Sequence, residues 1–441
     1  MTGHSPPFWR LFLVASDELA RRLSPSAQRG VLATPFSAPA IEDLCLGGLR
    51  AWGLTQVRLA RLCSKKQPPE EIKALLAIVF SCIKRGYRAP PILVDQAVRA
   101  AERRGGRPAA NFVNALLRST IEDPISAAQD EHALIARFNA PKEWIDAMVE
   151  DWGEAQAFDI LEAMRHQRGH WLRLMGDQVT QKDSLGALQR WATEQQILID
   201  ARLDHLPSLW LQSVRGLLQT PLFKQGKIRI QDWSAQQLAT ILSTGFKPLD
   251  PNHQNALDVC SAPGGKTFLM AEDPRLQGIW AFDKSALRLE AMRRELQRLG
   301  PEAGSEKIHI TAHDLMSDAW PPGCPAQHDL VVLDAPCTAS GVVARHPEIP
   351  WTNRLAKRRE LCETQSAMLS MVWKRLKPGG QLVYITCSVF RAEGEKQVED
   401  FLRREPGARR LSAPGHILPS PDKLGGPPGR DGFFYARILR A

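Results

Sequence analysis

The pattern of hydrophobic and polar positions divides the chain into three parts. From the N-terminus to about residue 140, apolar residues recur every three to four positions, as in residues 41–52 and 70–84, and no strand-like alternation competes with them. Proline pairs bracket the second of these segments and mark the ends of a helix. Residues 1–140 are therefore predicted to form an all-helical domain.

The pattern is mixed between residues 141 and 246. A helical segment at 144–152 precedes a short apolar run at 171–175, and a second helical segment at 184–193 precedes an extended segment at 227–230. This mixture predicts a small α+β middle module.

After a turn-rich linker at 247–252, the remainder of residues 247–441 alternates between two kinds of segment. The expected strands are 256–260, 278–283, 307–312, 329–334, 381–386 and 432–439, and the expected helices are 266–272, 286–299, 357–376 and 392–404. Strands that alternate with helices pair in parallel, with helices on both faces of the sheet. This part is predicted to be a doubly wound, Rossmann-like α/β domain, whose ligands bind at the carboxyl ends of the strands.

Composition narrows the class of protein. Hydrophobic residues make up 44% of the chain and charged residues 24%, as in soluble globular proteins, and no apolar run reaches the roughly 18 to 20 residues that span a bilayer. The eight cysteines are scattered, without the paired spacing of a zinc site. We therefore expect a cytoplasmic protein with free thiols, no secretion signal, no membrane anchor and no metal centre.

The surplus of positive charge is concentrated in one segment. The chain has a formal net charge of +9, and residues 84–119 hold only two acids among many basic residues. The basic residues are Lys84, Arg85, Arg88, Arg99, Arg103, Arg104, Arg107 and Arg118. A solvated helix face and a phosphate-contacting surface both explain this segment.

A glycine-rich turn connects the first expected strand of the α/β domain to its first helix. The turn is Cys260-Ser261-Ala262-Pro263-Gly264-Gly265-Lys266. Its glycines allow the backbone to approach a ligand closely, and the helix start offers free N–H groups. A nucleotide-binding P-loop would need glycine where Cys260 stands, and the dinucleotide fingerprint GxGxxG is absent.

Acidic residues end the next two strands. Asp283 stands where an acid of a doubly wound sheet commonly accepts hydrogen bonds from ribose hydroxyls. Asp314 follows the third strand, within reach of an adenine amino group. Each of the two, taken singly, also fits the role of a helix cap. Together with the glycine-rich turn they favour a nucleoside site.

Two cysteines follow apolar runs at the ends of strands. Cys337 comes after Asp334-Ala335-Pro336, and Cys387 lies between Thr386 and Ser388. A single cysteine in such a place is usually a buried structural residue. Two of them, at the ends of strands expected to be neighbours in a ligand-binding sheet, favour a catalytic pair. The residues alone do not decide which thiol attacks a substrate.

The motifs of this domain resemble those of a known family. In order they are DVCSAPGGKT, AFDKSALRLE, HDL, DLVVLDAPCTASGVVARHPEIPW and LKPGGQLVYITCS. They look like the motifs of the NOL/NOP/Sun family of S-adenosylmethionine-dependent RNA cytosine C5-methyltransferases, for which DAPC followed by TCS is highly specific. The basic segment with NFVNALLR is similar to the NusB-type RNA-binding domain of the family's bacterial ribosomal RNA enzymes, and the resemblance covers essentially the whole chain.

The resemblance implies roles for these residues. S-adenosylmethionine would bind at residues 260–266 with Asp283, Asp314 and Asp334. Cys387 would add to carbon 6 of the cytosine, and Cys337 would assist release. Lys266 is the candidate for the positive charge that a thiolate needs, and Asp334 would face the edge of the cytosine ring.

The resemblance also implies that the substrate is small-subunit (16S) ribosomal RNA. It implies in addition that the protein acts as a monomer. One alternative is a transfer RNA methyltransferase of the same family, against which the NusB-like domain argues. Another is a catalytically silent RNA-binding assembly factor, against which the retained thiols and acids argue. The segment 170–176 and Trp233 depart from the family's pattern and bear on RNA docking more than on the reaction.

Overall fold

The computed structural model describes residues 7–24, 38–63, 66–165, 169–202, 206–245, 254–300, 304–317, 320–419 and 429–441. The expected linker at 247–252 lies outside the described residues. The chain forms two compact units: Met1–Arg165 with Val343–Leu355, and His166–Val342 with Ala356–Ala441.

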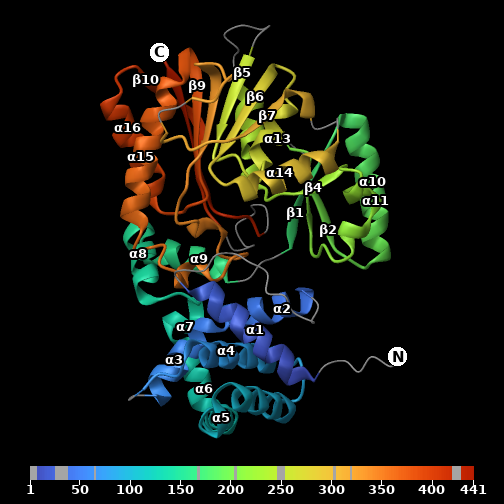
Figure 1. The fold of residues 1–441 in the computed structure, drawn as a ribbon, viewed down its shortest axis with the longest axis vertical. Helices are drawn as coiled ribbons and strands as arrows, with labels where there is room; N and C mark the ends of the chain where they lie inside the picture. Colours follow the sequence, from blue (N-terminus) through green and yellow to red (C-terminus); the bar gives the residue numbers. More distant parts are fainter. Residues whose placement is uncertain are drawn as a thin grey trace. The chain divides into compact units, whose positions relative to one another are not determined.

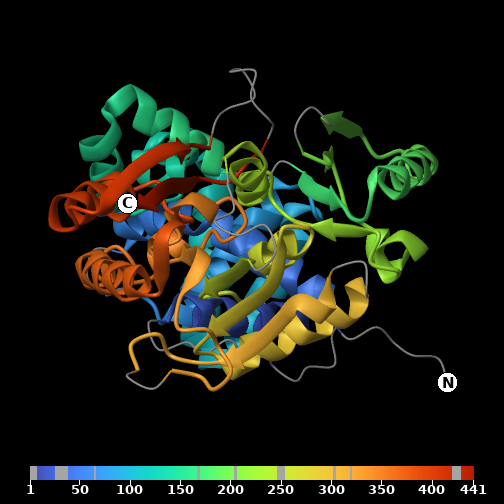
Figure 2. The ribbon, with the colours of Figure 1, turned by 90° about the horizontal axis from the view of Figure 1, so that it is seen from above.

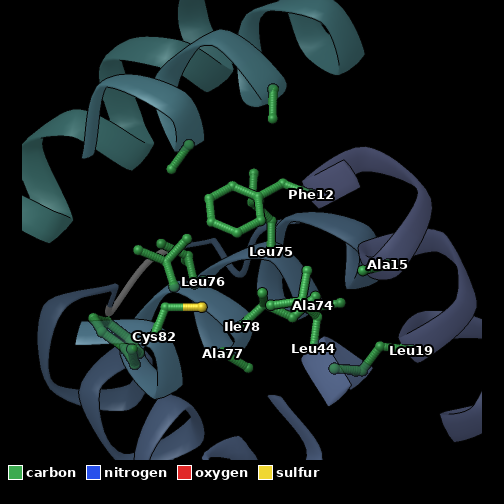
Figure 3. Packing of buried hydrophobic residues seen from close by; sticks show 14 of the residues in the cluster. Phe12, Ala15, Leu19, Leu44, Ala74, Leu75, Leu76, Ala77, Ile78 and Cys82 are labelled. Carbon is green, nitrogen blue, oxygen red and sulfur yellow. The ribbon is translucent and has the colours of Figure 1, made fainter. Parts of the chain in front are cut away.

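The regular secondary structure that is described in the first unit is helical, as the sequence predicted. Its α-helices are α1 (Phe8–Leu23), α2 (Ala38–Arg50), α3 (Trp52–Leu62), α4 (Glu70–Lys84), α5 (Pro90–Glu122), α6 (Pro124–His132), α7 (Leu134–Phe138), α8 (Lys142–Trp152) and α9 (Glu154–Met164). Helix α4 is central because every residue from Ala74 to Cys82 is buried. Phe12 of α1 and Leu44 of α2 belong to the same core (Figure 3).

Helix α5 consists of two helices joined at a glycine pair. Gly105 and Gly106 have non-helical backbone angles, with φ of 67° at Gly106, and Pro108 follows in the next turn. A positive φ is easily adopted only by glycine, so the pair allows the change of direction. The second half then buries Val113 and Leu117. The turn is therefore followed by a half-helix with a buried face.

The first unit includes two segments that the sequence analysis placed elsewhere. Helices α8 and α9 were expected to begin the middle module, and Val343–Leu355 was expected in the methyltransferase domain. The second segment belongs to the first unit because Trp351 packs against the helical core and donates from Nε1 to the carbonyl oxygen of Asn139 at 3.0 Å. The structure has two compact units, and the three-domain division stays a prediction.

The second unit begins with a small antiparallel sheet. Its strands are β1 (His170–Leu174), β2 (Ile199–Arg202), β3 (Ser208–Leu211) and β4 (Ile228–Ile230), in the order β2-β3-β1-β4. Helix α10 (Gln178–Glu194) lies next to this sheet in the chain's fold (Figure 2). Its Leu188 belongs to a core with Leu172 and Leu209. The short helix α11 (Pro221–Lys224) precedes β4. This is the expected α+β module.

A seven-stranded sheet fills the rest of the second unit. Its strands are β5 (Gln254–Val259), β6 (Leu276–Asp283), β7 (Ile308–Ala312), β8 (His328–Asp334), β9 (Leu376–Thr386), β10 (Ala408–Ile417) and β11 (Phe433–Arg440). The order is β10-β11-β9-β8-β5-β6-β7. The five strands from β9 to β7 are parallel, whereas β11 runs antiparallel to both of its neighbours. The sheet is therefore mixed and Rossmann-like, with a parallel part that extends from β9 to the edge strand β7.

Helices cover both faces of this sheet (Figure 1). On one face, Phe268 of α13 (Gly265–Ala271) and Leu289 of α14 (Ala286–Leu299) pack with Ala281 of β6. On the other, Leu369 of α15 (Arg358–Lys374) and Phe401 of α16 (Glu395–Arg404) pack with Phe282. Because Ala281 and Phe282 are adjacent in one strand, their side chains point to opposite faces. The doubly wound arrangement is confirmed.

The remaining elements of the second unit are short. They are α12 (Gln237–Gly245) and the 3₁₀ helices η1 (Leu217–Gln219), η2 (Ser234–Gln236), η4 (Ser305–Lys307), η5 (Ser340–Val342) and η7 (Arg391–Glu393). A further one, η6 (Ile349–Trp351), lies in the first unit. Among the described residues, none of the helices has both the length and the apolar character to cross a membrane.

Candidate active site

The glycine-rich turn follows β5 and is held tightly by its own backbone. Cys260 has φ of 61° and Gly264 has φ of 95°. The amide of Ser261 donates to the carbonyl of Phe282 at 3.0 Å, which ties the turn to β6, and the amide of Gly264 donates to the carbonyl of Ser261 at 2.7 Å. A Cβ atom on Gly264 would lie 2.5 Å from Cζ of Phe268. Only glycine fits this position without displacing its neighbours.

Side chains of the middle module support the same turn. Arg229 donates from Nη1 to the carbonyl of Gly264 at 3.4 Å, and Gln231 donates from Nε2 to the carbonyl of Gly265 at 3.2 Å. Burial lowers the pKa of Arg229 to about 10. The sequence analysis did not single out Arg229, although an arginine between two isoleucines of a buried strand was a usable signal.

The acids expected to bind a nucleoside lie at the carboxyl edge of the sheet. Asp283 is buried, accepts hydrogen bonds from the amides of Ala262 at 3.3 Å and Ser285 at 2.9 Å, and pairs with Nη1 of Arg288 at 3.2 Å. Asp314 is exposed and accepts from the amide of Met316 at 3.0 Å. Asp283 therefore also braces the glycine-rich turn.

The strand order arranges these groups in a row. Since β8, β5, β6 and β7 are consecutive parallel neighbours, their carboxyl ends carry Asp334, Cys260, Asp283 and Asp314 in that order. S-adenosylmethionine offers ribose hydroxyls, an adenine amino group and an ammonium group, all of which donate to carboxylates. The chemistry of this set of acceptors therefore fits that molecule.

Lys266 and Asp334 form a partly buried ion pair. The Nζ atom of Lys266 lies 2.5 Å from Oδ2 of Asp334 and 5.4 Å from the ring centroid of Phe433. Burial acts to lower the pKa of Lys266, but the charges of Asp334 and Cys387 and the hydrogen bond to Asp334 outweigh it and raise this pKa. Lys266 therefore remains a cation, and it interacts electrostatically with the thiol of Cys387.

The two predicted catalytic thiols are in contact. Strands β8 and β9 are parallel neighbours that pair Asp334 with Ile385, which places the loops after them side by side. The Sγ atoms of Cys337 and Cys387 lie 3.4 Å apart. Cys337 is buried, whereas Cys387 is partly exposed. The hydrogen bond with Cys387 and burial raise the pKa of Cys337 well above its ordinary value, so Cys337 is a protonated thiol.

The third cysteine of these motifs has a different environment. Burial raises the pKa of the Cys260 thiol to about 12, and the nearby charges of Asp334 and Asp283 act in the same direction. A thiol with this pKa is a poor nucleophile. The raised pKa argues against Cys260 as a second nucleophile.

The sequence analysis missed a buried polar network behind the two thiols. Its centre is Glu393, in η7, whose carboxylate accepts hydrogen bonds from Thr338 and Ser388, the residues that directly follow the two cysteines. The available signal was an acid five residues after TCS, beyond the apolar pair Val389-Phe390.

Comparison with known proteins identifies relatives of the chain. The model of the family described as 16S rRNA methyltransferase RsmB/F matches residues 247–439. Ribosomal RNA small subunit methyltransferase B of Xanthomonas campestris pv. campestris is 32% identical over 415 residues, which cover 92% of this chain and 90% of that protein.

Solved structures show the same fold. The crystal structure of PH0851 superimposes with a TM-score of 0.73 and 21% identity, and the match covers 99% of each chain. A methyltransferase homolog protein from Pyrococcus horikoshii superimposes with a TM-score of 0.53 and 25% identity, covering 70% of this chain and 97% of that one. The chain therefore belongs to the RsmB/F family of 16S rRNA methyltransferases, and its cofactor is S-adenosylmethionine.

Proposed function

We propose that this chain transfers a methyl group from S-adenosylmethionine to carbon 5 of a cytosine in small-subunit (16S) ribosomal RNA, through a covalent adduct with a cysteine. The observation that carries the proposal is the 3.4 Å contact between the Sγ atoms of Cys337 and Cys387 beside the Lys266–Asp334 ion pair. When bound, S-adenosylmethionine supplies an electrophilic methyl group.

Two thiols are useful because carbon 5 of cytosine is a poor nucleophile. The thiolate of Cys387 adds to carbon 6, and the electrons of the former 5,6 double bond make carbon 5 able to attack the methyl group. Methyl transfer would break the bond between the methyl group and the sulfonium sulfur, so that the cofactor would leave as S-adenosylhomocysteine. The proton on carbon 5 then passes to solvent water, the electrons of that bond restore the 5,6 double bond, and the bond between carbon 6 and Sγ breaks with its electrons passing to sulfur. Cys387 departs as a thiolate, and Cys337, 3.4 Å away, assists this release.

The surroundings of the thiols support this division of roles. Cys387 is the partly exposed thiol, and it interacts electrostatically with the Lys266 cation. Cys337 is buried and stays protonated. Asp334 is partly exposed beside Lys266, and its carboxylate is suited to accept a hydrogen bond from the 4-amino group of the cytosine.

Single substitutions of the two cysteines test the reaction. Cys387→Ala abolishes methylation, because carbon 5 is then not activated. Cys337→Ala retains addition but slows release, so a covalent complex of RNA and protein accumulates and survives denaturing electrophoresis. Cys362→Ala, which alters a partly buried thiol of α15, is the matched control and methylates normally. Full turnover by Cys387→Ala would overturn the proposal.

We propose that the first unit is an RNA-binding domain of the NusB type. We also propose that the protein acts as a monomer in the cytoplasm. The net charge of +9 supports an RNA partner. Bisulfite mapping of ribosomal and transfer RNA from a deletion strain, with and without the restored gene, tests the choice of substrate. A cytosine methylated only with the gene, and located in small-subunit RNA, is the expected result. Methylation restored in transfer RNA alone contradicts this part of the proposal.

A further inference from the structure

A buried carboxylate lies directly behind the two catalytic loops. Glu393 has no exposed surface, and each of its carboxylate oxygens accepts two hydrogen bonds. Oε1 accepts from the amide of Thr338 at 2.8 Å and from Nε2 of Gln365 at 3.2 Å. Oε2 accepts from Oγ1 of Thr338 at 2.5 Å and from Oγ of Ser388 at 2.6 Å. All four donors are uncharged groups.

These donors join the loops that carry the two thiols. Thr338 directly follows Cys337, and Ser388 directly follows Cys387, so a single carboxylate bridges the residues next to both thiols. The loops are joined a second time through Ser340, whose Oγ lies 2.8 Å from Oγ of Ser388. The network therefore holds two chain segments that are 50 residues apart in the sequence.

Other contacts fix the carboxylate itself. The hydroxyl of Tyr384 donates to the backbone carbonyl of Glu393 at 2.8 Å. Gln365 of α15 also donates to the carbonyl of Pro336 at 2.9 Å, so the helix is tied to the first catalytic loop. The position of Glu393 is thus determined from β9 and α15, the two elements that flank the loops.

Burial of an ionised carboxylate is unfavourable unless hydrogen bonds compensate for it, and apolar residues of the same volume often stabilise a core equally well. A requirement for stability alone therefore does not explain a charged group here. A requirement for precise geometry explains it, because one carboxylate can accept hydrogen bonds from both loops at once. Precise placement matters, since an error of about 1 Å in the position of reacting groups can lower a rate about 100-fold.

We propose that Glu393 is a positioning residue that holds the Cys337 and Cys387 loops in register by accepting hydrogen bonds from Thr338 and Ser388. The inference rests on the proposed cysteine chemistry. It assigns to Glu393 no contact with the substrate, only the placement of the two thiols. The negative charge of Glu393 has a second effect, since it adds to the hydrogen bond with Cys387 and to burial in raising the pKa of Cys337.

Substitution of Glu393 in the full-length protein tests the inference. Glu393→Ala lowers kcat for rRNA methylation about 100-fold, whereas KM for RNA and for S-adenosylmethionine changes less than about threefold. Glu393→Gln recovers most of this loss. Its amide oxygen still accepts from the Thr338 amide and from Gln365, and its amide nitrogen donates to the hydroxyls of Thr338 and Ser388 once these rotate.

A buried acid at the opposite end of β8 provides the matched control. Asp329 accepts hydrogen bonds from the amide of Asn255 at 3.0 Å and from Lys377 at 2.9 Å, and it contacts neither catalytic loop through these bonds. Asp329→Asn lowers the melting temperature but leaves kcat within about threefold of the original value. A loss of kcat in Asp329→Asn as large as in Glu393→Ala would show that destabilisation alone explains both.

The partners of Glu393 give a test that does not depend on the folding of Glu393→Ala. The double variant Thr338→Val with Ser388→Ala reproduces most of the loss of kcat, because the carboxylate acts on the loops through these two residues. Normal kcat in the double variant overturns the inference, and so does a normal kcat in folded Glu393→Ala.

The Cys337→Ala trap separates the inference from the proposed function. If Cys337→Ala forms no covalent RNA complex although Glu393 is intact, the cysteine chemistry is wrong, and the inference falls with it. If the complex forms, and forms equally fast when Glu393→Ala is added, only the role of Glu393 is wrong. The expected result is a complex that forms about 100-fold more slowly without the carboxylate.

Discussion

At the residue scale, the fold changes the pKa of side chains for which the sequence gives only the residue type. Asp258, the penultimate residue of β5, has no exposed surface. Burial raises its pKa to about 7, although Oγ1 of Thr267 donates to it at 2.5 Å and Lys266 lies nearby, both of which act to lower it. The charges of Asp334 and Asp283 act in the same direction as burial.

This pKa has a consequence for stability. The folded pKa lies above the ordinary aspartate value of 3.8, so the contribution of Asp258 is most favourable below pH 3.8 and is lost as the pH rises through about 7. The loss amounts to about 4 kcal/mol. We expect Asp258→Asn to be more stable than the original protein at pH 8, and the difference to vanish towards pH 4. Urea unfolding of both proteins across this range is the measurement, and parallel pH profiles would contradict the prediction.

The candidate site was predictable at this scale as a set of residue types. The motifs indicated two thiols, a lysine and a row of acids, because chemistry at strand ends depends on which side chains are present. They did not indicate that Lys266 pairs with Asp334, or that Glu393 joins the two loops, because hydrogen-bond partners far apart in the sequence are set by packing.

At the element scale, the turn between β5 and α13 is the most constrained feature of the site. Gly264→Ala places a methyl group 2.5 Å from Phe268 in addition to imposing an unfavourable φ of 95°. We expect a loss of about 2 to 4 kcal/mol in unfolding free energy and a rise of about tenfold in the Kd of S-adenosylmethionine. Thermal unfolding and calorimetric titration measure these two quantities.

Gly216→Ala is the matched control for this turn. Its φ is 79°, but the nearest atom to an added Cβ is 4.0 Å away. It should cost about 1 kcal/mol and leave cofactor binding unchanged. Equal effects of the two substitutions on cofactor binding would contradict the assignment of the turn.

The sequence predicted elements well where hydrophobic periodicity was strong. Helices α4 and α14 lie where they were expected, and the six predicted strands of the large sheet are present. Strand β10 was missed because its residues, Ala408–Ile417, include only two large apolar side chains, Leu411 and Ile417, contain Pro414 and form an edge of the sheet. An edge strand buries little apolar surface, so its periodicity is weak.

At the scale of the whole molecule, ion pairing changes the interpretation of the basic segment. Lys84 pairs with Glu131 and Arg85 with Asp43, each at 2.8 Å, and Arg99 and Arg104 also pair with acids. By contrast, Arg88, Arg103, Arg107 and Arg118 are exposed and form no ion pair with the acids that the structure describes. Phosphate contacts are therefore expected from these four arginines rather than from the whole segment.

This difference gives a testable contrast in RNA affinity. Neutralising Arg107 and Arg118 to glutamine should lower the slope of log K against log salt by about 1.5 and weaken binding several-fold, because about two phosphate contacts are lost. Neutralising Arg85 and Arg99 is the control, with a smaller effect because their charges are already partly compensated. Filter binding of ribosomal RNA between about 50 and 200 mM salt measures the slopes of both double variants. Equal slopes for the two double variants would count against the proposed RNA-binding role of Arg107 and Arg118.

The sequence by itself determined the classes of structure and chemistry. Three of its features are local: the helical periodicity of the first part, the alternation of strands and helices in the last part, and the ordered motifs around Cys337 and Cys387. Local features can be recognised without coordinates. The tertiary structure alone decided which distant groups meet. It brought the two thiols to 3.4 Å, placed Arg229 against the glycine-rich turn, assigned Val343–Leu355 to the helical unit and buried Glu393 between the catalytic loops. These outcomes depend on strand order and close packing, which no short stretch of sequence contains.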